Sequence, residues 1–480
     1  MKKLIKSYIA NGILLFLFCV GNSSCAKFDS YDSTTYQKLA KPTQNGSIAN
    51  SDFYFYTNSL AEDRSDIWKV SVNTPRQGSI ATFFGKYPMS ALPPYEQVLL
   101  NNLCESSPST CNENNQLAGI GITDMALSPN KRFLAWDDDV SICFGSTCYG
   151  VHRLFLFDTT QAGIPPKEIL EVPDHVLGEP EFQYIEDIQW SPDGNYLEIN
   201  QSLDNGSYRL LKVYDMNTHQ INDWGQGGLF TWSQDSSQYA YTINADGGHD
   251  QVIVQNREQQ IIFSQGWDHV YGLCWLPNKD RLVITADQVI NQVSGVYIAD
   301  INSKSVDKVK DIPLDANKFH FINPVCSPDG ARVAITAEDK QMKQIGVFVL
   351  DVTQNTIIEL AADKTMLNNP KWSPNGQLVG LNTIPSADSI SNGIAIINSL
   401  NGAIIARKEI ENATSDWSWA PGGDFLLLMT SPQSLCTSTE PQKIMKYYWQ
   451  SGQMDQVNFE DRDLEANLKN CKVDLSDPVW

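Results

Sequence analysis

The 480-residue sequence predicts an all-β fold, a single β-propeller built from four-stranded blades, and three observations support this prediction. A short turn motif returns seven times along the chain. Runs of β-branched and aromatic residues of strand length follow most copies. The two ends of the chain are complementary, since the start lacks a strand that the end supplies. A ring closed in this way leaves no long exposed sheet edge.

The repeated unit reads Trp-Ser-Pro-Asp-Gly followed by an apolar strand, with substitutions in most copies. Its Trp position is separated from the next by 42 to 63 residues, which is the period of a propeller blade. The aromatic residues at this position are predicted to be core wedges between blades. The seven residues at the Trp position are Leu127, Trp190, Trp232, Trp275, Cys326, Trp372 and Trp419.

The chemistry of the motif predicts a tight turn between two antiparallel strands. Ser suits the first position of a type I turn, Pro the second, Asp or Asn the third and Gly the fourth. The strand before the turn is the inner strand of a blade, and residues such as 332–335 form the second. A third strand, as in 346–351, and an outer strand, as in 356–360, complete the blade.

The chain ends predict how the ring closes. Residues 52–58 and 66–73 have the pattern of second and third strands, but no turn motif precedes them. We predict that the missing inner strand comes from the other end of the chain and pairs beside Phe53 and Tyr54. Seven internal hairpins and this shared one predict eight blades, with seven as the alternative. The closing residues are Asp477, Pro478, Val479 and Trp480, which resemble residues 369–372.

The first residues predict export. Lys2, Lys3 and Lys6 precede an apolar stretch too short to span a bilayer comfortably, which is typical of a signal peptide over residues 1–24. Small residues then lead into Cys25, and this pattern resembles the lipobox of bacterial lipoproteins, which implies lipidation of Cys25. Simple signal cleavage is the alternative. Residues 25–51 would form the anchor and a polar tether, and residues 52–480 the propeller.

Cysteine usage fits an oxidising compartment, because eight cysteines follow Cys25. Cys274 and Cys326 fall within apolar strands of different repeats and are predicted to be buried free thiols. No CxxC pair is present, so no zinc site is predicted. Three disulfides are candidates, pairing Cys104 with Cys111, Cys143 with Cys148, and Cys436 with Cys471.

The repeats resemble the TolB-type, WD40-like (PD40) propeller repeat, which has the same Trp-Ser-Pro-Asp-Gly turn followed by an apolar strand. The resemblance covers about residues 52–480 and implies the fold. It does not imply one function, because the family includes scaffolds, periplasmic binding proteins and propeller domains of peptidases. TolB itself has an α/β domain before a six-bladed propeller, whereas residues 26–51 here are short and polar.

Linear catalytic motifs are missing from the sequence. It contains no G-x-S-x-G elbow, HExxH or P-loop, and no cofactor site is predicted. Asp137, Asp138, Asp139 and the loop 244–247 could supply oxygen ligands for Ca²⁺, but solvated turns are the favoured interpretation. The histidines lie in different repeats, so only a site assembled from several blades could use them together: His152, His175, His219, His249, His269 and His320.

These observations predict a non-enzymatic scaffold or protein-binding propeller of the cell envelope. Inserted segments on a rigid fold commonly carry recognition, and residues 83–117, 162–184 and 460–476 are the candidates. The formal charge of −21 disfavours nucleic acid and anionic membranes as partners, so contact with a membrane is expected through a lipid anchor only. Ala26 after Cys25 favours the outer membrane within the lipoprotein family. The alternatives are a periplasmic propeller that binds a small ligand or glycan, and an enzyme with a site at the propeller mouth.

Overall fold

The computed structural model divides the chain into two compact units, Met1–Thr35 and Tyr36–Trp480, and every residue that it describes lies in the second. The signal peptide, Cys25 and the tether lie outside the described residues and stay predictions. No helix within the described part is long and apolar enough to cross a membrane. The described residues are 52–59, 64–71, 77–84, 86–88, 98, 116–144, 147–161, 164, 166–173, 183–203, 208–245, 249–256, 259–277, 280–289, 293–309, 312, 315–340, 345–354, 356–360, 366–384, 393–410, 413–430, 443–457 and 474–475.

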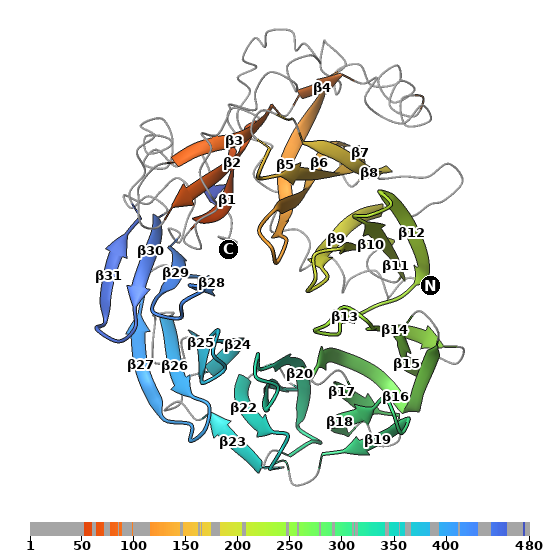
Figure 1. The fold of residues 1–480 in the computed structure, drawn as a ribbon, viewed down its shortest axis with the longest axis vertical. Helices are drawn as coiled ribbons and strands as arrows, with labels where there is room; N and C mark the ends of the chain where they lie inside the picture. The colour runs from red at the N-terminus through yellow and green to blue at the C-terminus, as the bar shows by residue number, and fades with distance from the viewer. Residues whose placement is uncertain are drawn as a thin grey trace, which may run out of the picture. The chain divides into compact units, whose positions relative to one another are not determined.

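The described strands form seven antiparallel sheets that follow one another around a ring within this unit (Figure 1). Five sheets have four strands. One of them combines β1 (Asp52–Ser59), β2 (Arg64–Ser71), β3 (Gln77–Phe84) and β32 (Asp474–Leu475). A second contains β9 (Gln183–Trp190), β10 (Tyr196–Leu203), β11 (Tyr208–Asp215) and β12 (Gln220–Gln226). A third contains β20 (Phe319–Cys326), β21 (Arg332–Asp339), β22 (Ile345–Asp351) and β23 (Thr356–Leu360).

The fourth and fifth four-stranded sheets end the repeat series. One contains β24 (Met366–Trp372), β25 (Leu378–Ile384), β26 (Gly393–Asn398) and β27 (Ile404–Glu409). The other contains β28 (Ala413–Trp419), β29 (Leu426–Thr430), β30 (Lys443–Tyr448) and β31 (Gln453–Gln456).

Two sheets are larger. The five-stranded sheet contains β4 (Lys86–Pro88), β5 (Gln116–Leu127), β6 (Phe133–Phe144), β7 (Thr147–Asp158) and β8 (Lys167–Pro173). The seven-stranded sheet contains β13 (Phe230–Trp232), β14 (Tyr239–Ala245), β15 (His249–Gln255), β16 (Gln260–Trp275), β17 (Arg281–Gln288), β18 (Ser294–Asp300) and β19 (Ser305–Lys308).

The predicted blade count is therefore wrong, both as eight and as seven, because the structure has five four-stranded blades beside these two larger sheets. The prediction from the sequence assumed that every repeat forms a separate sheet. In the structure β16 continues for 16 residues and pairs with β15 through its first part and with β17 through its second. Backbone hydrogen bonds of β16 therefore join the third and fourth repeats into one sheet. Part of the predicted insertion 162–184 is likewise an edge strand, β8, which pairs with β7.

A C-terminal strand joins the N-terminal sheet. In β32, Asp474 and Leu475 pair with Asn58 and Thr57 of β1. Phe53 and Tyr54 are fully buried in the core of this part. The four residues predicted to close the ring, 477–480, lie outside the described residues, so their pairing beside Phe53 and Tyr54 stays a prediction.

The turns form as their sequence predicts. In the repeat at Ser191, the amide of Gly194 donates to the Ser191 carbonyl at 2.8 Å, and the Ser191 hydroxyl accepts the amide of Tyr196 at 2.9 Å. Gly194 has a φ of +71°, which glycine adopts without steric cost. The same hydrogen bond from the fourth to the first position recurs at Ser128, Ser233, Ser327, Ser373 and Ala420.

The tryptophans at the repeat position are buried, as predicted, and most connect successive inner strands. The indole N–H of Trp372 donates to the carbonyl of Val325, the residue just before the Trp position of the preceding repeat. The equivalent bonds join Trp190 to Ala126, Trp275 to Thr231 and Trp419 to Lys371. Trp232 is buried too, but its Nε1 has no hydrogen-bond partner among the described residues.

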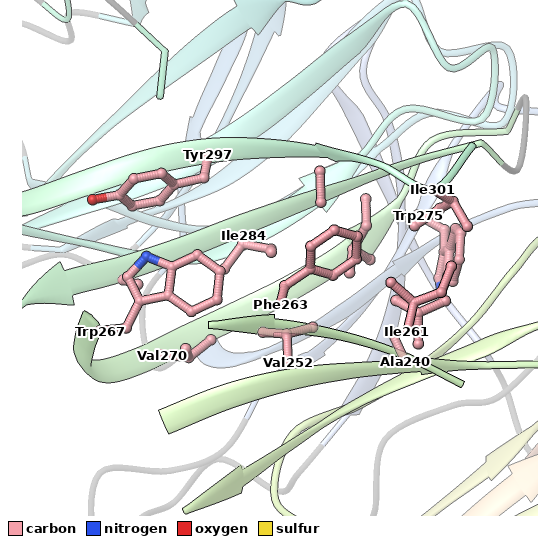
Figure 2. Packing of buried hydrophobic residues seen from close by; sticks show 14 residues of the cluster. Ala240, Val252, Ile261, Phe263, Trp267, Val270, Trp275, Ile284, Tyr297 and Ile301 are labelled. Carbon is pink, nitrogen blue, oxygen red and sulfur yellow. The ribbon is translucent and has the colours of Figure 1, made fainter. Parts of the chain in front are cut away.

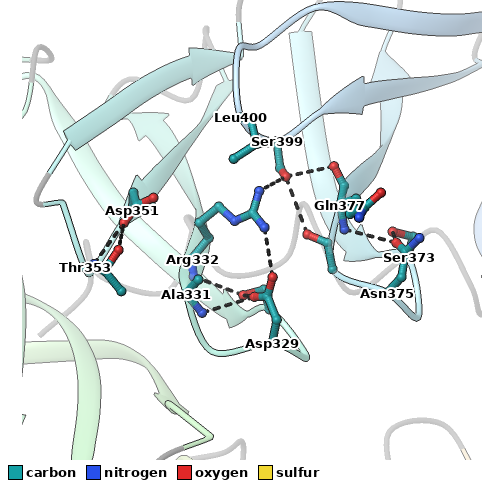
Figure 3. Close-up of polar contacts among 12 residues, drawn as sticks. Asp329, Ala331, Arg332, Asp351, Thr353, Ser373, Asn375, Gln377, Ser399 and Leu400 are labelled. Atoms are coloured by element: carbon teal, nitrogen blue, oxygen red, sulfur yellow. Dashed lines mark hydrogen bonds and ion pairs between the residues drawn. The ribbon is translucent and has the colours of Figure 1, made fainter.

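Side-chain packing completes the core inside and between sheets. In the seven-stranded sheet, Trp267 is fully buried beside Tyr297, at a ring separation of 5.5 Å, and packs in one cluster with Phe263 and Val270 (Figure 2). Polar contacts link other sheets. The Arg332 guanidinium donates to Asp329 and to Ser399, which follows β26 in the next sheet (Figure 3).

The prediction that Cys274 and Cys326 are free thiols is wrong, since a disulfide joins them with a Cα separation of 5.8 Å. Cys274 lies on β16 and Cys326 on β20, the inner strand of the next sheet. The two strands pack side by side, which the separate repeat patterns did not show.

The indole bond predicts a difference between two Trp to Phe substitutions. Trp372→Phe removes the indole donor to the Val325 carbonyl, whereas Trp232→Phe removes an N–H that bonds to no described residue. We expect W372F to destabilise the protein by about 1 kcal/mol more than W232F. Denaturant unfolding of the two variants measures this, and equal losses would contradict the bridging role.

The backbone register also bears on one candidate disulfide. Cys143 and Cys148 are direct partners across the β6–β7 hairpin. Facing residues of antiparallel strands have Cα atoms about 4.5 to 5.5 Å apart, a range that a disulfide spans. We expect mass mapping of the non-reduced protein to find this bond within one peptide. Quantitative alkylation of both thiols without a reductant would contradict it.

Candidate functional site

Five polar side chains from two neighbouring sheets meet beside the inner strands β16 and β20. The histidine–tyrosine cluster consists of Asp250 on β15, His269 and Tyr271 on β16, Asp287 on β17 and His320 on β20. The first four belong to the seven-stranded sheet and His320 to the following one. The cluster lies toward the start of the inner strands, away from the Ser-Pro-Asp-Gly turns at their ends.

Irregular pairing of β16 places the cluster residues. The register between β16 and β17 shifts between Trp267 and His269 and again between Val270 and Gly272, so Tyr271 has no partner residue in the ladder. Bulges of this kind redirect side chains and are frequent near functional sites. The buried Trp267 anchors the strand two residues before His269.

Hydrogen bonds and ion pairs organise the side chains into two connected groups. His269 Nδ1 lies 3.2 Å from Asp250 Oδ2, and the same carboxylate accepts the Val270 amide at 2.8 Å. In the second group, the Tyr271 hydroxyl donates to Asp287 Oδ2 at 3.2 Å, and His320 Nδ1 lies 2.8 Å from the same oxygen.

Aromatic contacts join the two groups into a row of three rings. The Tyr271 ring centroid is 4.7 Å from that of His269 and 5.2 Å from that of His320. The His269 side chain is 60% exposed and that of His320 28% exposed, whereas Asp287 is only 6% exposed. The imidazoles of His269 and His320 are therefore accessible to solvent, while the carboxylates beside them, Asp250 and Asp287, are buried.

Charge pairing sets the protonation of the first group. The hydrogen bond to Asp250 raises the pKa of His269, against the effect of its partial burial. Burial opposes ionisation of Asp250, but the contacts from His269, Val270 and Asn244 outweigh it and lower the pKa of Asp250. The ion pair is consequently favoured at mildly acid pH.

The second group keeps a proton on its phenol. Burial and the nearby Asp287 charge raise the pKa of Tyr271, so its hydroxyl remains a donor at neutral pH. Asp287 Oδ1 is buried and has no hydrogen-bond partner among the described residues. A bound ligand could supply the donor that this oxygen lacks.

The chemistry of the cluster suits hydrogen bonding and proton transfer. An exposed imidazole held at one nitrogen by a carboxylate can take up or release a proton at the other. Within the described part of the chain, no group of three or more His, Cys, Asp or Glu residues is arranged to hold a metal ion.

The predicted solvated turn at Asp137–Asp139 is wrong. These residues lie in strand β6, and Asp137 and Asp138 are almost completely buried. Thr123 donates to Asp137, and His152 Nδ1 lies 2.8 Å from it. Burial and the neighbouring Asp137 charge raise the pKa of Asp138 to about 8. This is a second buried polar group, in the five-stranded sheet.

The other candidate residues are separate from the cluster or undescribed. Asn244 donates to Asp250 at 3.1 Å, while Asp246 and Gly247 lie outside the described residues. His219 bonds to Tyr214 in another sheet. His175 lies outside the described residues, as do Cys104, Cys111, Cys436 and Cys471. So do most residues of the predicted binding segments: 89–97 and 99–115 of segment 83–117, 174–182 of segment 162–184, and 460–473 of segment 460–476.

Sequence reasoning missed the histidine–tyrosine cluster, although the repeat alignment contained a signal. His269 stands six residues before Trp275, and His320 stands six residues before Cys326. Two histidines therefore occupy the same position in consecutive repeats, and neighbouring inner strands bring equivalent positions together.

Comparisons with known proteins relate this chain to propeller structures. No protein-family model matches the sequence. None of the curated proteins matches it either. Among solved structures, the chain is similar to the β-propeller domain of the Trilobed protease from Pyrococcus furiosus, with 12% identity and a TM-score of 0.44, over 71% of this chain and 98% of that one.

Three further structures give a mixed picture. TolB from Acinetobacter baumannii has 13% identity and a TM-score of 0.36, over 74% of this chain and 78% of TolB. An oligogalacturonate lyase in complex with manganese has 13% identity and a TM-score of 0.43, over 72% and 86%. A prolyl endopeptidase has 12% identity and a TM-score of 0.48, over 77% of this chain and 54% of its own, so this chain spans about half its length. At these identities and scores, none of them assigns a function.

The Asp250–His269 pair predicts a pH dependence. A raised His269 pKa stabilises the fold fully below about pH 6.5, the unfolded value, and this contribution is lost as pH rises through the folded pKa. The lowered Asp250 pKa stabilises above about pH 3.9 and is lost as pH falls through its own folded value. The pair should therefore contribute most between about pH 4 and 6.5.

NMR titration with histidine-selective labelling tests this assignment. Asp250→Asn should lower the pKa of His269 and leave the His219 signal as it is in the wild type. An unchanged His269 titration in D250N would show that the pair does not form in solution.

Proposed function

We propose that this protein is a ligand-binding propeller and that the histidine–tyrosine cluster is its binding site. The observation that carries the proposal is the convergence of Tyr271 and His320, from different sheets, on the buried carboxylate of Asp287. Three adjacent aromatic rings, two of them imidazoles accessible to solvent, lie beside two buried carboxylates. This arrangement has the features of a polar ligand site rather than of a packed core.

The charge around the cluster favours an uncharged ligand with hydroxyl groups, such as a small sugar. Asp250 and Asp287 line the cluster, and the exposed Asp268 lies beside it, so an anion would be repelled at neutral pH. Carboxylate oxygens accept hydroxyl hydrogen bonds, and ring faces pack against apolar C–H groups.

Proton transfer by His269 is part of this proposal. A His–Asp pair of this kind serves as a general acid or base when a ligand lies within hydrogen-bond reach. An enzymatic role for the site is therefore included, with the ligand as substrate.

A binding experiment tests the proposal with defined probes. Glucose, galactose, N-acetylglucosamine and maltose are titrated into the protein, and the histidine NMR signals and calorimetric heats are followed. We expect at least one sugar to shift the His269 and His320 signals. Losing the Tyr271 hydroxyl and the His320 ring should weaken binding at least tenfold, about 1.4 kcal/mol, in Y271F and H320A.

The matched control is His219→Ala. It also removes a histidine that bonds to a tyrosine, Tyr214, but in a different sheet. Binding should be unaffected in H219A. If no sugar perturbs the cluster, or if H219A weakens binding as much as H320A, the proposed site is wrong.

A protein-binding scaffold is a second candidate, and an exposed apolar strip on an outer strand favours it. Leu400, Ile404 and Ile405 are 63%, 38% and 47% exposed on and beside β27, the edge strand of its sheet. Exposed apolar edges are typical docking sites. The I404K/I405K variant should bind a purified protein partner more weakly, and Y271F should bind it as the wild type does. Sugar binding should show the reverse, with weaker binding in Y271F and wild-type binding in I404K/I405K.

The cellular setting is part of the proposal and rests on the sequence alone. We propose export by the signal peptide and anchoring to the outer membrane through lipidated Cys25, with other envelope proteins as partners. Intact mass of the mature protein from membranes would show the lipid on an N-terminal Cys25.

A further inference from the structure

We infer that the Cys274–Cys326 disulfide is a positioning element for the histidine–tyrosine cluster and makes that site sensitive to reduction. The inference rests on the proposed function for its consequence in ligand binding. Its structural part, the effect on the positions of His269, Tyr271 and His320, can be tested without any ligand.

The disulfide replaces the indole bridge that connects successive inner strands elsewhere. In four repeats, the indole N–H donates to the carbonyl of the residue just before the Trp position of the preceding repeat. In the fifth repeat the Trp position holds Cys326. The residue just before Trp275, in the preceding repeat, is Cys274. The disulfide therefore joins the same two positions that an indole and a carbonyl join in the other repeats.

Close packing of the two strands runs from the disulfide to the cluster. Two residues before Cys274 lies Gly272, and two residues before Cys326 lies Pro324. A Cβ added to Gly272 would be 2.2 Å from Pro324 Cδ, so a side chain at this position would force the strands apart. Tyr271, next to Gly272, meets the ring of His320 at 5.2 Å.

The strands β16 and β20 thus carry both the histidine–tyrosine cluster and the disulfide that joins them, which we call the clamp. β16 holds His269, Tyr271 and Cys274, while β20 holds His320 and Cys326. Tyr271 and His320 reach the same oxygen of Asp287 only while the two strands keep their spacing. No indole is present at position 326 to maintain that spacing once the covalent bond is gone.

A dithiol reductant can open the clamp. Thiolate attack breaks the S–S bond and forms a mixed disulfide, whose resolution leaves two protein thiols and oxidises the reductant to its own disulfide. Cys274 is buried and Cys326 is partly exposed, which gives the reductant access from the Cys326 side. Reduction should then move His320 relative to Tyr271 and weaken ligand binding.

Histidine-selective NMR of the full folded chain tests the inference, with dithiothreitol as the reductant and six histidines to follow. Dithiothreitol should shift the His269 and His320 signals and leave His219 in place. Cys274→Ser with Cys326→Ser should show the shifted signals without reductant and should not respond to it further. Cys104→Ser with Cys111→Ser is the matched control and should keep the wild-type signals.

A repeat-restoring variant separates positioning from loss of folding. Cys274→Ala with Cys326→Trp reproduces the Ala126–Trp190 arrangement of another repeat, so it should return the His269 and His320 signals toward the oxidised wild type. If C274S/C326S does not fold, the inference is tested by the His269 and His320 signals of two other samples. These are the wild type treated with dithiothreitol and the variant C274A/C326W. Unchanged His269 and His320 signals on reduction of a protein shown by mass to hold free Cys274 and Cys326 would overturn the inference.

The two proposals fail in distinguishable ways. Signals that move on reduction in a protein that binds none of the sugars uphold the positioning role and reject the ligand. A sugar that binds oxidised and reduced protein equally upholds the site and rejects its redox dependence.

Discussion

The contact between successive inner strands is the constraint on which the rest of the structure depends. Each sheet is internally hydrogen-bonded, but sheets join one another mainly through side chains. In four repeats the buried indole lies between two inner strands and donates its N–H to a backbone carbonyl of the preceding inner strand. Where the indole is replaced, at Cys326, a covalent bond takes over its place. Neighbouring inner strands are thus held together by an indole–carbonyl hydrogen bond in four repeats and by a disulfide in another.

The contact between inner strands also explains where the polar cluster lies. Residues at the same repeat position on adjacent inner strands are neighbours in space, and the repeat position of His269 and His320 is the same. The bulge at Tyr271 turns a third ring into the gap between them. The buried carboxylates of Asp250 and Asp287 lie beside these rings, the first paired with His269 and the second accepting a hydrogen bond from Tyr271.

The sequence predicted local features well and non-local ones poorly. The turn at Ser191 and the burial of Trp372 follow from the residues that form them, so both predictions were confirmed. The blade count failed because the repeat pattern does not show that β16 continues from one neighbour to the next without a break. The Cys274–Cys326 bond was missed because its partners are 52 residues apart on strands of different sheets. The cluster was missed for the same reason, since its side chains come from four strands.

The uninterrupted strand β16 has a consequence for how such a ring changes over evolutionary time. Repeat units fold on contacts with their neighbours, so a unit can be removed cleanly only where no strand runs through its boundary. An excision inside β16 would sever a ladder that holds β15 on one side and β17 on the other. Removal of the third or the fourth repeat alone would therefore leave a broken ladder, whereas removal of both together would not cut through β16.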